Sequence, residues 1–174
     1  NGGTVHFNGN GQIGGTAPTV FNHVRNTGTL VGHPATIRVL GGWDGSAGVF
    51  VHNDGQVMFS GVTTQTVATG GAWNGSLNNW KNGWGDLIVS NTSGGGVVFA
   101  DGFKARRLVC TAPGSLLQFR TQDDVTNVYE ITEPGGLTLQ GAPGSLIRLR
   151  RFGGSGTQQW ELAPAGGGWS AAYV

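Results

Sequence analysis

The pentapeptide APGSL occurs twice in this chain, at Ala112–Leu116 and again, 30 residues later, at Ala142–Leu146. Each copy leads into a short apolar run. About ten residues further on, Asn127–Ile131 is echoed by Gln158–Leu162, with an offset of 31 residues. A repeat of this length, built from short apolar runs and glycine turns, predicts a structural unit in which each copy stacks on the one before it.

A second, looser repeat relates Gly3–Gly9 to Gly55–Gly61, with an offset of 52 residues. The segment that follows the second copy is longer than the one that follows the first. The excess falls at residues 70–83, which are rich in tryptophan and asparagine. We therefore predict an inserted loop at about 70–83.

Glycine accounts for 34 of the 174 residues, and it is poor in helix interiors but well tolerated at turns. The glycines do not recur at every third position, which excludes a collagen triple helix. Between them lie short runs of alternating apolar character, the pattern of strands with one buried face. The runs are Thr4–Phe7, Thr36–Leu40, Val49–His52, Gln56–Phe59, Leu87–Val89, Gly96–Phe99, Arg107–Cys110, Leu116–Phe119, Leu137–Leu139 and Leu146–Leu149.

The spacing of these runs suits a sandwich, a barrel or a solenoid, and the internal repeats favour the solenoid. We predict an all-β fold in which residues 1–174 form a single β-solenoid domain. At roughly 20 to 25 residues per coil, the chain would make about seven or eight coils, a rod about 35 Å long at the usual strand spacing. A β-sandwich is the alternative fold.

Composition excludes several classes of protein. Ten Lys and Arg residues against nine Asp and Glu give a net charge of +1, which provides no electrostatic basis for binding nucleic acid or an anionic membrane. No apolar run approaches the roughly 18 to 20 residues of a membrane span. The single cysteine, Cys110, forms no internal disulfide and is expected to be a small buried residue. No phosphate-binding glycine loop of the GxxxxGK[ST] type occurs. We expect no cofactor.

The most distinctive local feature is a group of tryptophans within and just after the predicted loop. Aromatic rings stack on sugars and amides bond sugar hydroxyls, so this segment is a candidate for binding a surface glycan. The favoured alternative is that the indoles cover the flank of the solenoid or pack on a neighbouring subunit, because tryptophan is enriched at interfaces. The candidate residues, for carbohydrate or for a partner, are Trp73, Asn74, Asn79, Trp80, Lys81 and Trp84.

The C-terminal third is rich in arginine. Arg148 and Arg150 alternate on a predicted strand, so both point outward. Stacked coils would set them against Arg120 or against acidic neighbours as a surface cation ladder. Cross-strand pairs of this kind contribute only about 0.2 to 1 kcal/mol each.

The sequence contains no convincing catalytic constellation. Asp123 and Asp124 form the only acidic doublet, and enzymes of the pectinase type use paired carboxylates for inverting hydrolysis or for binding Ca²⁺. Polygalacturonases carry a glycine before such a pair, whereas Gln122 stands there in this chain. All four histidines precede the doublet, and they show no metal-ligand spacing with Cys110. We therefore expect a solvated turn at the doublet, no enzyme activity, no catalytic residues and no metal site; a polysaccharide lyase or hydrolase is the least favoured alternative.

Several stretches resemble repeat units of large secreted bacterial surface proteins. Units of the form GTVxFNGxGxQ and FxNLTIxN are resembled by Gly3–Gln12, Gly55–Gly61 and Asp86–Asn91. A second element, ITLRSxxxGTQWxI followed by SVSYV, is resembled by Gly144–Arg150, Gly156–Trp160 and Ser170–Val174. These proteins are adhesin-like chains similar to filamentous haemagglutinin, and the resemblance covers most of the sequence. It implies a right-handed parallel β-helix located outside the cell, at the bacterial surface.

The two ends of the sequence lead to a functional expectation. Asn1–Gly3 runs directly into a predicted strand, and Ser170–Val174 ends on one. Uncapped coils expose strand edges that invite pairing with further strands. Either the chain is a segment of a longer protein, or subunits associate head to tail into a fibre. We favour self-association, which makes the protein a structural or adhesive subunit of a cell-surface filament; the alternative function is carbohydrate binding.

Overall fold

The computed structural model describes residues 2–70, 82–121, 127–154 and 159–174, which contain strands and turns but no helix. Every ladder between the named strands is parallel. The prediction of an all-β fold is therefore confirmed. The parallel pairing disagrees with the alternative of a β-sandwich, because the sheets of that fold are antiparallel.

One sheet has seven strands, and each strand pairs with the next one along the sheet. In spatial order they are β1 (Thr4–Phe7), β4 (His23–Asn26), β7 (Trp43–Asp44), β10 (Gln65–Ala68), β12 (Val97–Phe99), β14 (Leu116–Arg120) and β17 (Arg148–Phe152).

The other sheet has twelve strands, arranged in two arms that share two long strands, β11 (Asn82–Val89) and β13 (Phe103–Cys110). The first arm also contains β2 (Gly11–Gln12), β5 (Thr29–Val31), β8 (Val49–Val51), β15 (Asn127–Ile131) and β18 (Trp160–Pro164). The second arm also contains β3 (Thr19–Phe21), β6 (Thr36–Val39), β9 (Gln56–Phe59), β16 (Leu137–Gln140) and β19 (Ser170–Ala172).

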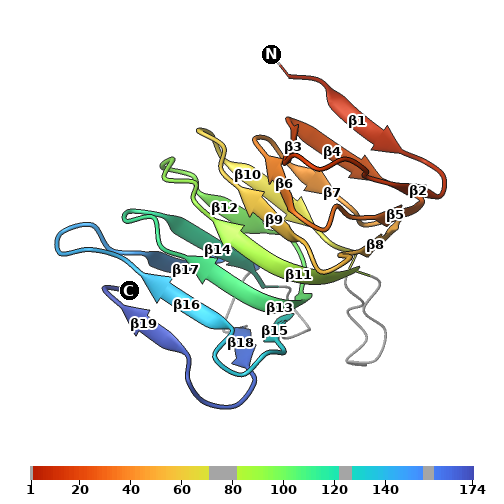
Figure 1. The fold of residues 1–174 in the computed structure, drawn as a ribbon. Coiled ribbons are helices and arrows are strands. Elements are labelled where there is room, and N and C mark those ends of the chain that lie inside the picture. The colour runs from red at the N-terminus through yellow and green to blue at the C-terminus, as the bar shows by residue number, and fades with distance from the viewer. Residues whose placement is uncertain (1, 71–81, 122–126, 155–158) are drawn as a thin grey trace.

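The chain visits the seven-stranded sheet and then the two arms in the same order seven times. In the fourth and fifth passes one long strand, β11 or β13, serves both arms. Figure 1 shows the result as a layered array, with β1 and the N-terminus at one end and β19 and the C-terminus at the other. Early passes take about 20 residues, since β1, β4 and β7 start at residues 4, 23 and 43. The pass from β10 to β12 is longer and contains residues 71–81, so most of the predicted loop lies outside the described residues.

The sequence repeats predict the turns more accurately than the register. Gly114 and Gly144, at equivalent positions of the APGSL copies, both adopt left-handed backbone conformations, with φ of 83° and 75°. The strand after the second copy starts later than predicted, however, because Leu116 pairs with Arg148 and not with Leu146. Asn127 likewise pairs with Trp160, two residues beyond the position that the echoed sequence predicts. A shift of two residues keeps every side chain on its predicted face, since side chains alternate along a strand.

The looser repeat does not correspond to equivalent places in the fold. Thr4–Phe7 forms β1 of the seven-stranded sheet, whereas Gln56–Phe59 forms β9 of the twelve-stranded sheet. The two segments share a strand pattern and a glycine turn, and this local likeness produced the predicted repeat.

Inward side chains form continuous apolar rows that run from pass to pass. The prediction that Cys110 is a small buried residue is confirmed, because its side chain is fully buried in one of these rows. That row contains one residue from each of the seven passes: Phe21, Val39, Phe59, Val89, Cys110, Leu139 and Ala171.

Candidate functional site

The middle of the array has a dry aromatic interior. Two aromatic groups fill it, and every member is at most 2 % exposed. In the first group ring centroids lie 5.0 to 6.1 Å apart, and the members are Trp43, Phe50, Phe59 and Trp84. In the second group the separations are 4.8 to 6.4 Å, and the members are Phe99, Phe103, Phe119 and Tyr129.

The same inward positions are open to solvent at the two ends. Val5 in β1 is 40 % exposed, although Val24, its neighbour in the same row, is 2 % exposed. At the other end the ring of Trp160 stacks on the ring of Phe119, with centroids 4.5 Å apart. Trp160 itself is only half-buried. No strand of the described residues lies beyond these terminal strands. Each end therefore presents a partly exposed apolar surface that another layer of strands would cover.

The terminal strands also carry backbone groups that face away from the array. The carbonyl of Phe21 in β3 accepts a hydrogen bond from the backbone beyond β6, at 2.9 Å. Successive residues of a strand turn their peptide groups to opposite sides, so Val20 turns its N–H and C=O to the outer edge. At the opposite end the Ala172 carbonyl accepts a bond from the turn after β16, at 2.9 Å, so Ala171 faces outward in the same way. Each end is thus a strand edge with the chemistry of a parallel ladder.

The two ends of the array differ in charge. Residues 1–22, which form the first pass, contain no Lys, Arg, Asp or Glu, and Arg25 in the second pass lies 4.0 Å from Asp44. Residues 142–174 contain three arginines and a single acid, Glu161. Contact between the two ends would therefore bring a cationic face against one without charged side chains.

The three predicted ladder residues lie on the outer face of the seven-stranded sheet. Arg120, Arg148 and Arg150 are all exposed and belong to the neighbouring strands β14 and β17. The register places Gln118 opposite Arg150 and Phe152 opposite Arg120, so Arg120 and Arg150 are diagonal neighbours. No carboxylate of the described residues forms an ion pair with any of the three. The arginines share a face without standing directly opposite one another.

The predicted tryptophan site cannot include Trp84. The strand β11 starts at Asn82, earlier than the sequence pattern indicates, and Trp84 points inward from it. Its side chain is 2 % exposed and contacts Trp43, Phe50 and Phe59. A ring in this position is not available to stack on a sugar. The other five candidates, at positions 73, 74, 79, 80 and 81, lie outside the described residues.

A network of ion pairs that the sequence reading missed lies on the outer face of the twelve-stranded sheet. Asp86 accepts hydrogen bonds from Nε of Arg106 and of Arg107, each at 3.0 Å. Arg106 also lies 3.5 Å from Asp54 and 3.6 Å from Glu133. Burial raises the pKa of the Asp86 carboxyl, but the hydrogen bonds and charges of the two arginines outweigh burial and hold this pKa below its ordinary value.

The arrangement of this network is that of a structural clamp. Both Asp86 oxygens are occupied by arginine, which leaves the carboxylate no role as a free base. The bonds join β11 to β13, and the contact with Asp54 extends the network to the turn before β9. The sequence did hold a signal, since Asp86 lies 20 and 21 residues before the arginine pair, which is about one pass.

A buried carboxylate fixes the chain where it enters the predicted loop. Asp101 Oδ1 accepts hydrogen bonds from the backbone N–H and the hydroxyl of Thr69, at 2.7 and 2.8 Å, and its Oδ2 accepts one from Gly70 N–H at 2.8 Å. Burial raises the pKa of Asp101, and these hydrogen bonds only partly oppose it. The chain is therefore anchored at Thr69 and Gly70 by a carboxylate whose ionised form is less favourable there than in water.

The remaining candidates show no assembled chemistry. Burial raises the pKa of the Cys110 thiol, and Asp123 and Asp124 lie outside the described residues. Within the described ranges, no three His, Cys, Asp or Glu side chains gather as a metal site requires. The described residues also include no helix that is long and apolar enough to cross a membrane. Comparisons with protein-family models, curated proteins and solved structures found no match.

Proposed function

We propose that this chain is a structural element of a bacterial cell-surface fibre, built as a right-handed parallel β-helix whose coils continue from one chain to the next. Its function is mechanical in this proposal and involves no catalysis. Backbone hydrogen bonds along the ladders and apolar rows in the interior make a stiff rod, and the ends propagate it. The resemblance to secreted adhesin-like repeats supports the extracellular location.

The observation that carries the proposal is that both ends of the array expose strand edges of the same kind as the edges that pair inside it. Each end presents three strands, β1, β2 and β3 at one end and β17, β18 and β19 at the other. All internal ladders are parallel, so the two sets of edges have the direction that one further step of the same stacking requires. The inward residues on both sides are largely apolar, as Val5 and Trp160 illustrate.

A contact of this kind does not close on itself. The β17 side of one chain meets the β1 side of the next, and a head-to-tail contact that does not close produces a filament. With seven strands at the usual parallel spacing, each chain adds about 34 Å to the length. The first pass carries no Lys, Arg, Asp or Glu, so the contact does not depend on salt bridges and should persist in high salt.

Electron microscopy of the purified chain at neutral pH tests this proposal. We expect unbranched rods of variable length whose width is that of one chain. Monodisperse single particles at high protein concentration and high salt would contradict it. Glycan binding through the 73–81 segment remains the alternative function, and loss of glycan-array binding in Trp80→Ala, with retained folding, would favour it.

A further inference from the structure

The outer face of the seven-stranded sheet carries a hollow of about 390 Å³ over β4, β7 and β10. The hollow exists because two small residues stand among the outward-facing side chains of neighbouring strands. Gly42 has no side chain between His23 and Thr66, and Ala68 follows Asp44 in the neighbouring row.

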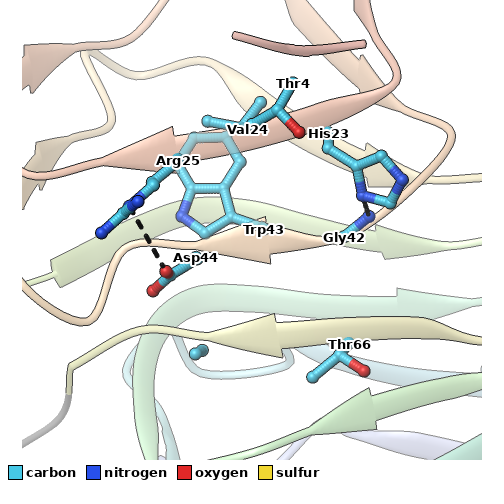
Figure 2. Close-up of a pocket in the computed structure, with 9 residues that line it drawn as sticks. Thr4, His23, Val24, Arg25, Gly42, Trp43, Asp44 and Thr66 are labelled. Carbon is cyan, nitrogen blue, oxygen red and sulfur yellow. Dashed lines mark hydrogen bonds and ion pairs between the residues drawn. The ribbon is translucent and has the colours of Figure 1, made fainter. Parts of the chain in front are cut away.

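Polar groups stand around the hollow in fixed positions. Figure 2 shows Arg25 and Asp44 toward one end and His23 and Thr66 toward the other. Asp44 Oδ1 accepts hydrogen bonds from the N–H and the hydroxyl of Ser46, at 3.2 and 2.6 Å, which orients the carboxylate. Its other oxygen lies 4.0 Å from Nε of Arg25. Both side chains are about half-exposed, at 57 % and 54 %, so they remain accessible to a ligand.

The histidine is oriented by the backbone. The N–H of Gly42 donates to Nδ1 of His23 at 2.7 Å. Nδ1 therefore acts as an acceptor, and in the neutral imidazole the ring proton lies on Nε2. The hollow thus offers N–H donors from His23 and Arg25, a carboxylate acceptor from Asp44, and a Thr66 hydroxyl that acts in either role.

This set of groups selects against charged ligands. Arg25 and Asp44 cancel one another, so an anion would meet the carboxylate and a cation would meet the guanidinium. A pair of neighbouring hydroxyls satisfies both, because one hydroxyl donates to Asp44 while the other accepts from Arg25. The floor of the hollow at Gly42 and Ala68 carries little side chain, which leaves room for a sugar ring. The volume falls within the range of small-ligand sites.

We propose that this hollow binds a neutral saccharide unit. Arg25 and Asp44 form hydrogen bonds with a pair of its hydroxyls, and His23 forms one with a third. The site is separate from the 73–81 segment. It also lies on a sheet face and not on a strand edge, so it stays open whether or not chains stack, and its test is independent of filament formation.

The experiment is a titration of the purified chain, followed by isothermal calorimetry, with neutral hexasaccharides of glucose and mannose and with oligogalacturonate as the anionic probe. We expect binding of a neutral oligosaccharide and at least a tenfold loss of affinity in Arg25→Met and in Asp44→Asn, a change of about 1.4 kcal/mol or more. Ala68→Leu fills the hollow without changing charge and should abolish binding. Arg38→Met is the matched control, because Arg38 is an exposed arginine of the other sheet that bonds Ser60 Oγ at 2.6 Å.

Three results would overturn the proposal. The first is no binding of any neutral probe by the wild-type chain. The second is a preference for oligogalacturonate that Asp44→Asn strengthens, which would identify an anion site. The third is neutral-sugar binding that survives Ala68→Leu but is lost in Trp80→Ala, which would place the site in the 73–81 segment. Thermal melting of each variant identifies losses that come from unfolding.

Discussion

The middle and the ends of this array are made of the same rows of residues, yet they differ completely in exposure. Phe59 and Val89, in the middle of one inward row, are at most 1 % exposed, whereas Phe21 and Ala171, which end that row, are half-buried and exposed. Sequence character does not cause this difference, since Phe21 is as apolar as Phe59. A side chain of the row is buried from solvent only where strands pack on both sides of it. In this row the ends therefore differ from the middle because no described strand packs on their outer side.

The largest effect that this comparison predicts is in the middle. Phe99→Ala should cost about 3–5 kcal/mol in the free energy of unfolding, because the ring is fully buried and contacts Phe103, Phe119 and Tyr129. Phe21→Ala is the matched variant at the end and should cost clearly less, because its ring is only half-buried. Guanidinium unfolding of both variants measures the difference. Equal losses would mean that the ends are packed as tightly as the middle.

The turns that separate the passes come next in magnitude. Valine at Gly114 or Gly144 must adopt a left-handed backbone, which costs on the order of 1–3 kcal/mol. Gly114→Val should be the worse of the two, because a Cβ there would lie 3.1 Å from Ser145 Oγ, while a Cβ at Gly144 meets nothing. Gly3→Val is the control, since Gly3 also has open space and no left-handed φ. Trp80→Ala should likewise be tolerated, and melting temperatures as low as those of the turn variants would contradict the account.

The ion pairs of Asp86 make the free energy of unfolding depend on pH. Because the pKa of Asp86 is lowered in the folded state, its stabilisation is present at neutral pH and is lost as pH falls from about 4 through the lowered folded pKa. Asp101 acts in the opposite sense, because its raised pKa means that protonation relieves an unfavourable buried charge. Asp86→Asn should cost about 1–3 kcal/mol at neutral pH and progressively less in acid.

Denaturant unfolding from about pH 7 to pH 2 measures this dependence. Asp44→Asn is the matched control, since its exposed pair with Arg25 contributes only about 0–1 kcal/mol. If Asp86→Asn were as mild as the control at neutral pH, the network would not act as a clamp.

The smallest effect on stability should come from changes at the strand edges, where the effect on assembly should be large. Val20→Pro and Ala171→Pro each remove an N–H that faces outward, so the fold loses no ladder bond while the edge loses a donor. Val20→Thr and Ala171→Ser keep that N–H and serve as controls. We expect the proline variants to melt near the wild-type temperature and to form shorter assemblies. Unchanged assembly would show that these edges do not pair.

The sequence predicted the local features of this fold better than its long-range ones. Thr4–Phe7 and Gln56–Phe59 are strands with the predicted bounds, and the glycines of both APGSL copies have the expected turn conformation. The strand after the second copy was misplaced by two residues because a shift of two leaves every side chain on its face, so the apolar pattern carries no information about it.

The candidate sites show the same limit. The sequence groups Trp84 with Trp73 and Trp80 as a candidate binding residue beside the predicted loop, but the pairing of β11 with β8 and β13 extends the strand through it. The contact between Asp86 and the arginine pair depends on the register between β11 and β13, which the sequence alone does not supply. The hollow beside Gly42 depends in the same way on which residues lie side by side across three strands.

The most direct test of the central claim is sedimentation velocity of the purified chain over a range of concentrations, in low salt and in about 1 M NaCl, where the Debye length is about 3 Å. We expect a series of species that grows with concentration and persists in high salt, because the first pass carries no Lys, Arg, Asp or Glu and the contact is made by backbone groups and apolar side chains. A single monomer peak that changes with neither concentration nor salt would contradict the claim that these ends pair with one another.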